Sequence, residues 1–327
     1  MSVSHQYLFN RILDITAIIH VPIKVLSIVI VIRYSPPHMR LLSFFLLNGL
    51  VWNFAANLVF TVMHVYPMYP AECFRTDGIV SFIDNEIFSH AIFGLLFVFI
   101  LNTVIAVTST FIYRYIIFVF PNQIEFIKRR LLLSTFALHI GVTIATAVLY
   151  TKWALLKESY PDKDELPLGN SVLCLNPYGP QKDGALWTFI GGIAVATFVC
   201  LASAFLLLVS IYRKRGIVHK KSLDNHKKVL QILVTVSSIP LLFAAVPITI
   251  AVATSLNPKM SHAEAICLVC IVLLSNHGTF YSIALILVIK PYRKGAYSLL
   301  LSMVCRKRND LQHVVPTKSV FSVRYNE

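Results

Sequence analysis

The sequence predicts an all-α membrane protein: a bundle of seven transmembrane helices, with the N-terminus outside and the C-terminus in the cytoplasm. Seven apolar segments fill most of the chain, at about residues 12–32, 41–65, 87–113, 131–151, 187–212, 229–254 and 264–289. A helix needs about 20 mostly apolar residues to cross a bilayer, and each segment reaches that length with few or no charges. Lipid offers no hydrogen-bond partners, so segments that span it must be helical.

The composition leaves little room for anything outside this bundle. Hydrophobic residues make up 57% of the chain and charged residues 13%, and the mean hydropathy is +0.71. These values lie outside the range of soluble globular proteins. We expect one seven-helix domain, residues 1–290, and a cytoplasmic tail, residues 291–327, which begins with a short amphipathic helix beside the membrane.

The distribution of basic residues predicts the orientation. The formal net charge is +14, and 21 of the 29 Lys and Arg lie in residues 33–40, 114–130, 213–228 and 290–327. If the N-terminus is outside, all four of these segments are cytoplasmic, which is the arrangement that positively charged loops favour. Attraction to anionic membrane lipid accounts for such charge, so we expect no nucleic acid among the partners.

Two cysteines fall in the predicted outer loops. Cys73 lies in the first loop and Cys174 in the second, both on the oxidising side, and we expect a disulfide between them. The second outer loop, about residues 152–186, is rich in proline and charge, and reads either as a structured lid over a ligand vestibule or as a solvated loop. Cys305 precedes Arg306 and is a candidate for palmitoylation.

Polar and aromatic side chains in the bundle are candidates for contact with a small-molecule ligand, because polar groups in a membrane face the interior or water. We select His90, Trp187, Phe243, Asn276 and His277. Hydrogen bonding within the protein is the alternative role for the polar ones. Their spacing does not demand a metal ion or a cofactor. The sequence also lacks the short motifs of common catalytic sites, so we expect no enzyme activity.

Lys24 lies within the first apolar segment, one turn after His20. Snorkelling to the membrane surface would be strained from this depth. A polar partner in the second or seventh helix is an alternative, but no acidic residue stands at a matching depth, and the sequence assigns Lys24 no role. Asn53 and Asn57 of the second helix lie four residues apart and can hydrogen-bond across helices.

The sixth segment contains Pro240 and Pro247, and each proline removes a backbone hydrogen bond. We therefore expect kinks in this helix and interpret it as a moving part.

Basic residues near the inner ends of the helices suggest a docking surface for a signalling partner. Arg114 closes the third segment, and further candidates follow the fifth and seventh segments. These are Arg213, Lys214, Arg215, Pro291, Tyr292 and Arg293.

Several of these positions form a recurring pattern. The motifs are Ser35-Pro36-x-x-Met39, Leu46-Leu47-Asn48 with Trp52, Arg114, Gln231 with Ile239-Pro240 and Pro247, His277-Gly278, and Pro291-Tyr292-Arg293. Together they resemble the nematode serpentine chemoreceptors of the Str superfamily, most closely class H (Srh) and next class I (Sri), over about residues 20–300.

The resemblance implies a G-protein-coupled receptor of rhodopsin-type topology. Its implied partners are a small environmental molecule and the Gα subunit of a heterotrimeric G protein, and a receptor oligomer stays open. Its implied location is the plasma membrane of sensory neuron cilia. The chain departs from the pattern at Asn57, where an acidic residue is expected, and at Ile112 and Tyr113, because no acidic residue precedes Arg114.

The sequence leaves two other functional classes open. A ligand-gated channel subunit of seven helices would have its N-terminus inside, against the charge distribution. A small transporter would show internal repeats and broken helices near the middle of the membrane.

Overall fold

A computed structural model describes residues 3–120, 124–161, 163–166, 171–213, 220–257 and 259–313 of the chain. Within them, seven helical stretches are long and apolar enough to cross a membrane, which confirms the predicted fold class. The α-helices are α1 (Val3–Tyr34), α2 (Arg40–Met63), α3 (Glu86–Val119), α4 (Ile124–Trp153), α5 (Pro180–Arg213), α6 (Lys220–Pro240), α7 (Val246–Leu256), α8 (Ala263–Val288) and α9 (Lys290–His313). Short 3₁₀ helices lie at Pro37–Met39, Ile79–Ile83, Lys157–Ser159 and Lys163–Glu165.

The helices extend beyond the predicted apolar segments. α1 begins at Val3 and α5 at Pro180, where the sequence is still polar. Hydropathy marks only the part of a helix that matches the hydrocarbon core, whereas the backbone hydrogen bonds continue into the polar region beyond it.

The sixth span is made of three pieces in succession. α6 is followed by a π-helical segment, η6 (Leu241–Ala245), and then by α7. Pro240 ends α6 and Pro247 lies in the first turn of α7, so the two prolines flank the π-helical segment. Neither proline can donate a backbone hydrogen bond, and the helix is irregular here as the sequence predicted. Isolated π-helical turns of this kind are often found at functional sites.

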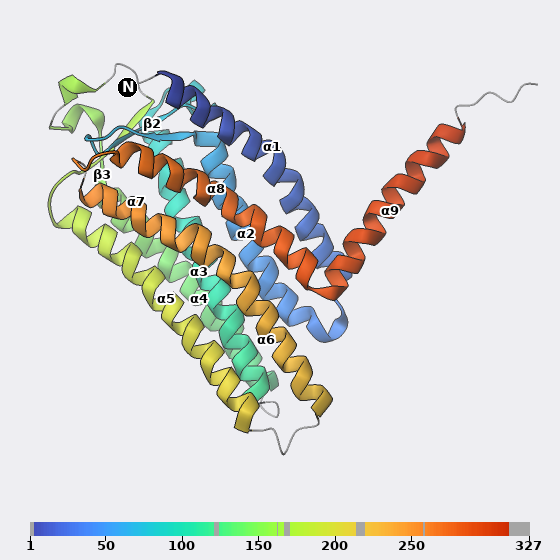
Figure 1. Ribbon diagram of the computed structural model, residues 1–327. Helices are drawn as coiled ribbons and strands as arrows, with labels where there is room; N and C mark the ends of the chain where they lie inside the picture. Colours follow the sequence, from blue (N-terminus) through green and yellow to red (C-terminus); the bar gives the residue numbers. More distant parts are fainter. Residues whose placement is uncertain are drawn as a thin grey trace, which may run out of the picture.

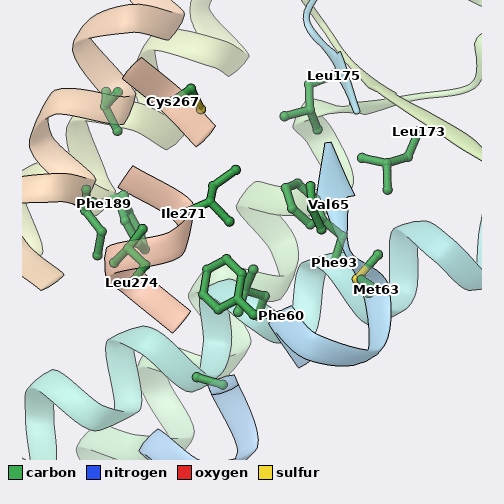
Figure 2. Packing of buried hydrophobic residues seen from close by; sticks show 14 of the residues in the cluster. Phe60, Met63, Val65, Phe93, Leu173, Leu175, Phe189, Cys267, Ile271 and Leu274 are labelled. Atoms are coloured by element: carbon green, nitrogen blue, oxygen red, sulfur yellow. The ribbon is translucent and has the colours of Figure 1, made fainter. Parts of the chain in front are cut away.

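The helices pack around α3, which contacts α2, α4 and α5 (Figure 1). On the other side, α8 packs against α1, α2 and α7. Buried side chains form one large cluster in the half of the bundle that carries the β-strands and a second at the opposite end. Figure 2 shows Phe60, Phe93, Phe189 and Leu274 of the larger cluster.

A small antiparallel sheet covers one end of the bundle. Its strands are β1 (Val65–Pro67), β2 (Cys73–Thr76), β3 (Ala154–Leu155) and β4 (Val172–Leu175), in the order β1-β2-β4-β3. Cys73 and Cys174 are register partners on β2 and β4, and they form the predicted disulfide. The described part of the second loop is therefore a structured lid. We refer to this end as the outer end, following the predicted orientation.

The chain leaves the bundle at the inner end through α9, which starts directly after α8. Its first turns contact α1 and α8, and it then projects away from the bundle (Figure 1). At this junction a Cβ on Gly295 would overlap the ring of Tyr34, so the close contact with α1 requires glycine.

Candidate functional site

A cavity of about 160 Å³ lies in the outer half of the bundle, beneath the sheet. We refer to it as the outer cavity. Its walls are mainly apolar, and their aromatic residues include Phe60, Phe93, Phe97, Tyr150, Trp153 and Phe189. The ring of Phe97 packs edge-to-face against Phe93 and Phe189, with both centroid distances 5.3 Å. Rings held in this way give the cavity a fixed, apolar shape.

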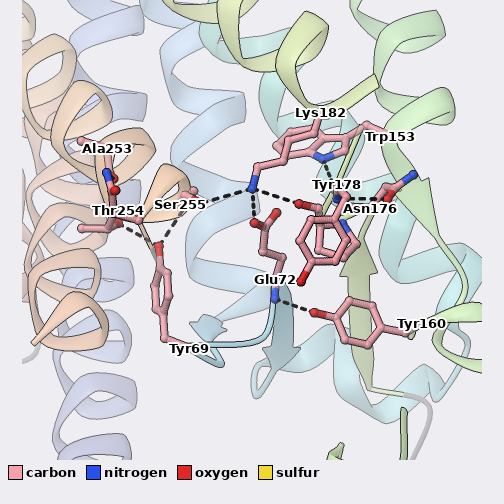
Figure 3. Close-up of polar contacts among 12 residues, drawn as sticks. Tyr69, Glu72, Trp153, Tyr160, Asn176, Tyr178, Lys182, Ala253, Thr254 and Ser255 are labelled. Carbon is pink, nitrogen blue, oxygen red and sulfur yellow. Dashed lines mark hydrogen bonds and ion pairs between the residues drawn. The ribbon is translucent and has the colours of Figure 1, made fainter. Parts of the chain in front are cut away.

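Polar groups meet at the roof of the outer cavity (Figure 3). Lys182 of α5 forms a buried ion pair with Glu72 of the first outer loop. Its Nζ also donates to the carbonyl oxygens of Pro177, at 3.2 Å, and Ser255, at 3.3 Å. Burial raises the pKa of the Glu72 carboxyl, and the contact with Lys182 opposes that rise. Lys182 thus ties the first loop, the second loop and the end of α7 together.

A neutral hydroxyl also reaches this roof. The hydroxyl of Tyr69 lies 2.7 Å from Thr254 Oγ1 and 3.3 Å from Ser255 Oγ. Burial raises the pKa of Tyr69 to about 12, so the phenol is protonated at neutral pH. Tyr69, Glu72 and Ser255 all line the outer cavity, so the cavity has a polar end and mainly apolar walls.

A second cavity, of about 200 Å³, lies deeper in the bundle between α3, α5 and the sixth span. We refer to it as the middle cavity. Four residues line both cavities and therefore separate them: Phe60, Ile100, Ile248 and Leu274. Pro240, Leu241, Ala244 and Ala245 place the π-helical segment in its wall.

A chain of hydrogen bonds crosses the bundle beside the middle cavity. Lys24 of α1 is fully buried, and its Nζ donates to Oδ1 of Asn53 on α2. The Nδ2 of Asn53 lies 2.7 Å from Nε2 of His277 on α8, and Nδ1 of His277 contacts the carbonyl oxygen of Leu274. A carbonyl only accepts, so Nδ1 of His277 carries the hydrogen and Nε2 accepts from Asn53. Lys24 therefore has a polar partner in the second helix, one of the two alternatives that the sequence left open.

Gly278 leaves the space that the hydrogen bonds of Lys24 and Asn53 need. A Cβ at this position would overlap both Asn53 Oδ1 and Lys24 Nζ. The adjacent pair His277-Gly278 thus has a physical explanation, because the histidine ends the chain and the glycine leaves space for it.

The two asparagines predicted to bond across helices differ in the structure. Asn53 does so, whereas neither Nδ2 nor Oδ1 of Asn57 has a hydrogen-bond partner among the described residues, although Asn57 is buried. Asn48, on the same helix, lies 2.9 Å from Nε2 of His139 on α4.

The structure does not bring the five predicted ligand contacts together. His277 lines the middle cavity. His90 lies behind the wall of the outer cavity, with its Nδ1 2.9 Å from the hydroxyl of Tyr150. Asn276 donates to Thr16 Oγ1 of α1 at 3.2 Å.

The two aromatic candidates face outward. Trp187 is 68% exposed near the outer end of α5, where tryptophan commonly meets the membrane interface. Phe243 packs against Phe280 at a centroid distance of 5.5 Å on the exposed side of the sixth span. The sequence did not reveal the residues that do line the outer cavity, such as Trp153 and Glu72.

A third cavity, of about 180 Å³, lies at the inner end, and we refer to it as the inner cavity. It brings together Arg114 of α3, Val236 of α6, Leu285 of α8 and Pro291 of α9. The Nε of Arg114 has no hydrogen-bond partner, and Arg114 takes part in none of the ion pairs, within the described part of the chain.

The remaining coupling candidates have different environments. Tyr292 is fully buried, with its hydroxyl 3.1 Å from Ser35 Oγ and 2.9 Å from Ser43 Oγ, so it joins α1, α2 and α9. Arg293 is accessible and donates to the carbonyl oxygen of Leu287. Arg213 is exposed at the end of α5.

Two of the predicted coupling residues, Lys214 and Arg215, lie outside the described residues, as does the side chain of Cys305.

The structure thus combines seven candidate membrane spans with a disulfide-linked lid over an apolar cavity, features that seven-transmembrane receptors share. The chain belongs to the family described as serpentine type 7TM GPCR chemoreceptor Srh, whose family model matches residues 4–302. No curated protein matches the chain. The family is one of receptors, in agreement with the expectation of a protein that is not an enzyme.

Gly278→Ala tests the hydrogen-bond chain. The added methyl group must displace Asn53 or Lys24, and we expect a loss of about 1–3 kcal/mol in stability, the usual range for an overpacked core. The measurement is the thermal denaturation of the purified receptor. Gly141→Ala in α4 is the matched control, because nothing lies within 4 Å of a Cβ there. Equal stability of the two variants would contradict the role given to Gly278.

Proposed function

We propose that this receptor binds a small, mostly apolar molecule in the outer cavity and activates a heterotrimeric G protein through the inner cavity. One observation carries the proposal. The sixth span lines both cavities: α7 contributes Ile248, Ala251 and Val252 to the outer one, and α6 contributes Ile232 and Val236 to the inner one. A single helix therefore adjoins the site for the ligand and the site for the G protein.

The chemistry of the outer cavity indicates the class of ligand. An engineered protein cavity of about 150 Å³ lined by Leu, Ile and Phe binds benzene, and the outer cavity is of similar size. Its roof adds the Tyr69 hydroxyl and the Glu72 carboxyl. We therefore expect a compact, uncharged ligand with a hydrocarbon body and one hydroxyl, carbonyl or ether oxygen.

The π-helical segment lies between the two sites and gives the sixth span a place to rearrange. Ligand binding would favour one of two pre-existing arrangements of this span, and the shift would open the inner cavity. Because η6 is flanked by two prolines, its backbone has fewer hydrogen bonds to break than a regular helix.

The inner end provides the groups for coupling. Arg114 lines the inner cavity without an ion-pair partner among the described residues, and Arg213 and Arg293 lie on accessible surface nearby. We assign Arg114 to direct contact with Gα and the other two to electrostatic attraction. Tyr292 acts indirectly, by holding α1, α2 and α9 together. The proposed location is the plasma membrane of sensory neuron cilia.

Ala251→Phe tests the ligand site. The wild-type receptor, expressed with a Gα reporter, is screened against alcohols, ketones, esters and aromatic hydrocarbons of about benzene size. For each active compound we expect Ala251→Phe to raise the half-maximal concentration at least tenfold, because the new ring occupies the cavity; tenfold corresponds to about 1.4 kcal/mol. Ala253→Phe is the control, since Ala253 is exposed on the same helix. A panel without active compounds, or equal responses of the two variants, would argue against this site.

Arg114→Ala tests coupling. Removing the guanidinium should abolish Gα activation and leave surface expression at the wild-type level. Arg129→Ala is the matched control, because Arg129 is exposed at the start of α4 and lines none of the three cavities. Unchanged signalling by Arg114→Ala at normal expression would show that another group makes the contact.

A further inference from the structure

The middle cavity adjoins the lipid-facing surface of the bundle. Three residues that line it are also exposed: Leu201 of α5 is 61% exposed, Val234 of α6 is 48% exposed, and Leu241 of η6 is 38% exposed. These residues lie on the two helices that border the cavity on this side. The cavity therefore adjoins the bilayer between α5 and the sixth span.

These residues lie at the depth of the hydrocarbon core. Leu201 is twelve residues from the inner end of α5, which is about 18 Å at 1.5 Å per residue. Leu241 is fourteen residues from Lys227, where the membrane-spanning part of the sixth span begins, or about 21 Å. Because the hydrocarbon core is about 30 Å thick, the groups outside this opening are methylene groups of acyl chains, and lipid headgroups lie further away.

The lining of the middle cavity suits a hydrocarbon. Among the described residues, no Asp, Glu, Lys or Arg lines it. The hydroxyls of Thr103, Thr108 and Ser238 donate to backbone carbonyl oxygens of their own helices, at 2.7–2.9 Å. Asn53 and His277 already bond to each other. An occupant therefore gains apolar contacts and has little need for polar groups.

The middle cavity is separate from the outer cavity. Phe60, Ile100, Ile248 and Leu274 stand between the two cavities, and the side chains of Ile248 and Leu274 are buried. The exposed lining residues give an occupant a direct route from the bilayer, and acyl chains are the molecules present there.

We propose that the middle cavity is a binding site for one acyl chain of a membrane lipid, inserted between α5 and the sixth span. The chain end lies against Ala244 and Ala245 of the π-helical segment. The site is distinct from the proposed ligand site, and its occupancy does not depend on any signalling function.

The test uses the full-length receptor in lipid nanodiscs that contain a phosphatidylcholine with a diazirine in the middle of one acyl chain. Irradiation labels the residues in contact with that chain, and peptide mass spectrometry locates the labels. We expect labels on inward-facing residues of the cavity, namely Ala196, Ala244 or Ala245, besides those on exposed residues such as Leu206. Labels restricted to exposed residues would overturn the proposal.

A pair of variants on α5 sharpens this test. Ala196 lines the middle cavity, whereas Ala194, two residues earlier, is exposed and lines none of the three cavities. Ala196→Phe should reduce labelling of Ala244 and Ala245 at least fivefold, and Ala194→Phe should leave it unchanged. If Ala196→Phe fails to reach the membrane, Ala245→Phe fills the same cavity from the opposite wall, with loss of label on Ala196 as its readout. Equal labelling in the filled and control variants would contradict the site.

Discussion

A buried amino group in the middle of a membrane bundle must find its hydrogen-bond partners within the protein, and the placement of Lys24 imposes this constraint on three helices at once. Lys24 of α1 binds Asn53 of α2, which binds His277 of α8. None of these bonds can form unless the three helices keep their spacing and register. The close approach of Gly278 to Asn53 and Lys24 follows from the same constraint.

The helices differ in how much of their apolar stretch is buried, and the difference follows the hydrogen bonds among Lys24, Asn53 and His277 only in part. In α2 and α8, 56% and 50% of the most apolar stretch is buried, against 17% in both α5 and the sixth span. Two of the three helices tied by the hydrogen bonds are therefore the most deeply buried of the seven candidate spans, whereas α1, the third, is 33% buried. α5 and the sixth span are buried to a smaller extent, and this side of the bundle contains the π-helical segment and borders the middle cavity. Such an arrangement lets the sixth span change shape against a fixed partner.

Much of this fold could be predicted from the sequence, because bilayer thickness sets the length of apolar segments and lipid excludes unpaired backbone. The disulfide followed from the position of Cys73 and Cys174 in the outer loops, whereas the role of Lys24 did not follow from its depth in the first segment. The motif residues Ser35 and Gly278 prove to lie at contacts between α1, α2 and the C-terminal helices.

The outer cavity could not be predicted in the same way. Trp153 lies two residues beyond the predicted fourth segment, yet it is 6% exposed and lines the cavity, whereas Trp187, at the start of the fifth segment, is 68% exposed and faces outward. Which face of a transmembrane helix points inward depends on its neighbours, and lipid and protein interior favour the same apolar residues. The pairing of Glu72 with Lys182 joins positions 110 residues apart and has no local signal.

The most direct test of this account is a double-mutant cycle between Lys24 and Asn53. The stabilities of Lys24→Met, Asn53→Leu and the double variant are measured by thermal denaturation of the purified receptor. If the two side chains form the central bond of the bundle, the double variant should lose less stability than the sum of the single losses, by at least about 1 kcal/mol. The same cycle with Asn48→Leu, which removes the bond to His139, should be additive. Additivity of the Lys24 and Asn53 losses to within about 0.5 kcal/mol would contradict the account.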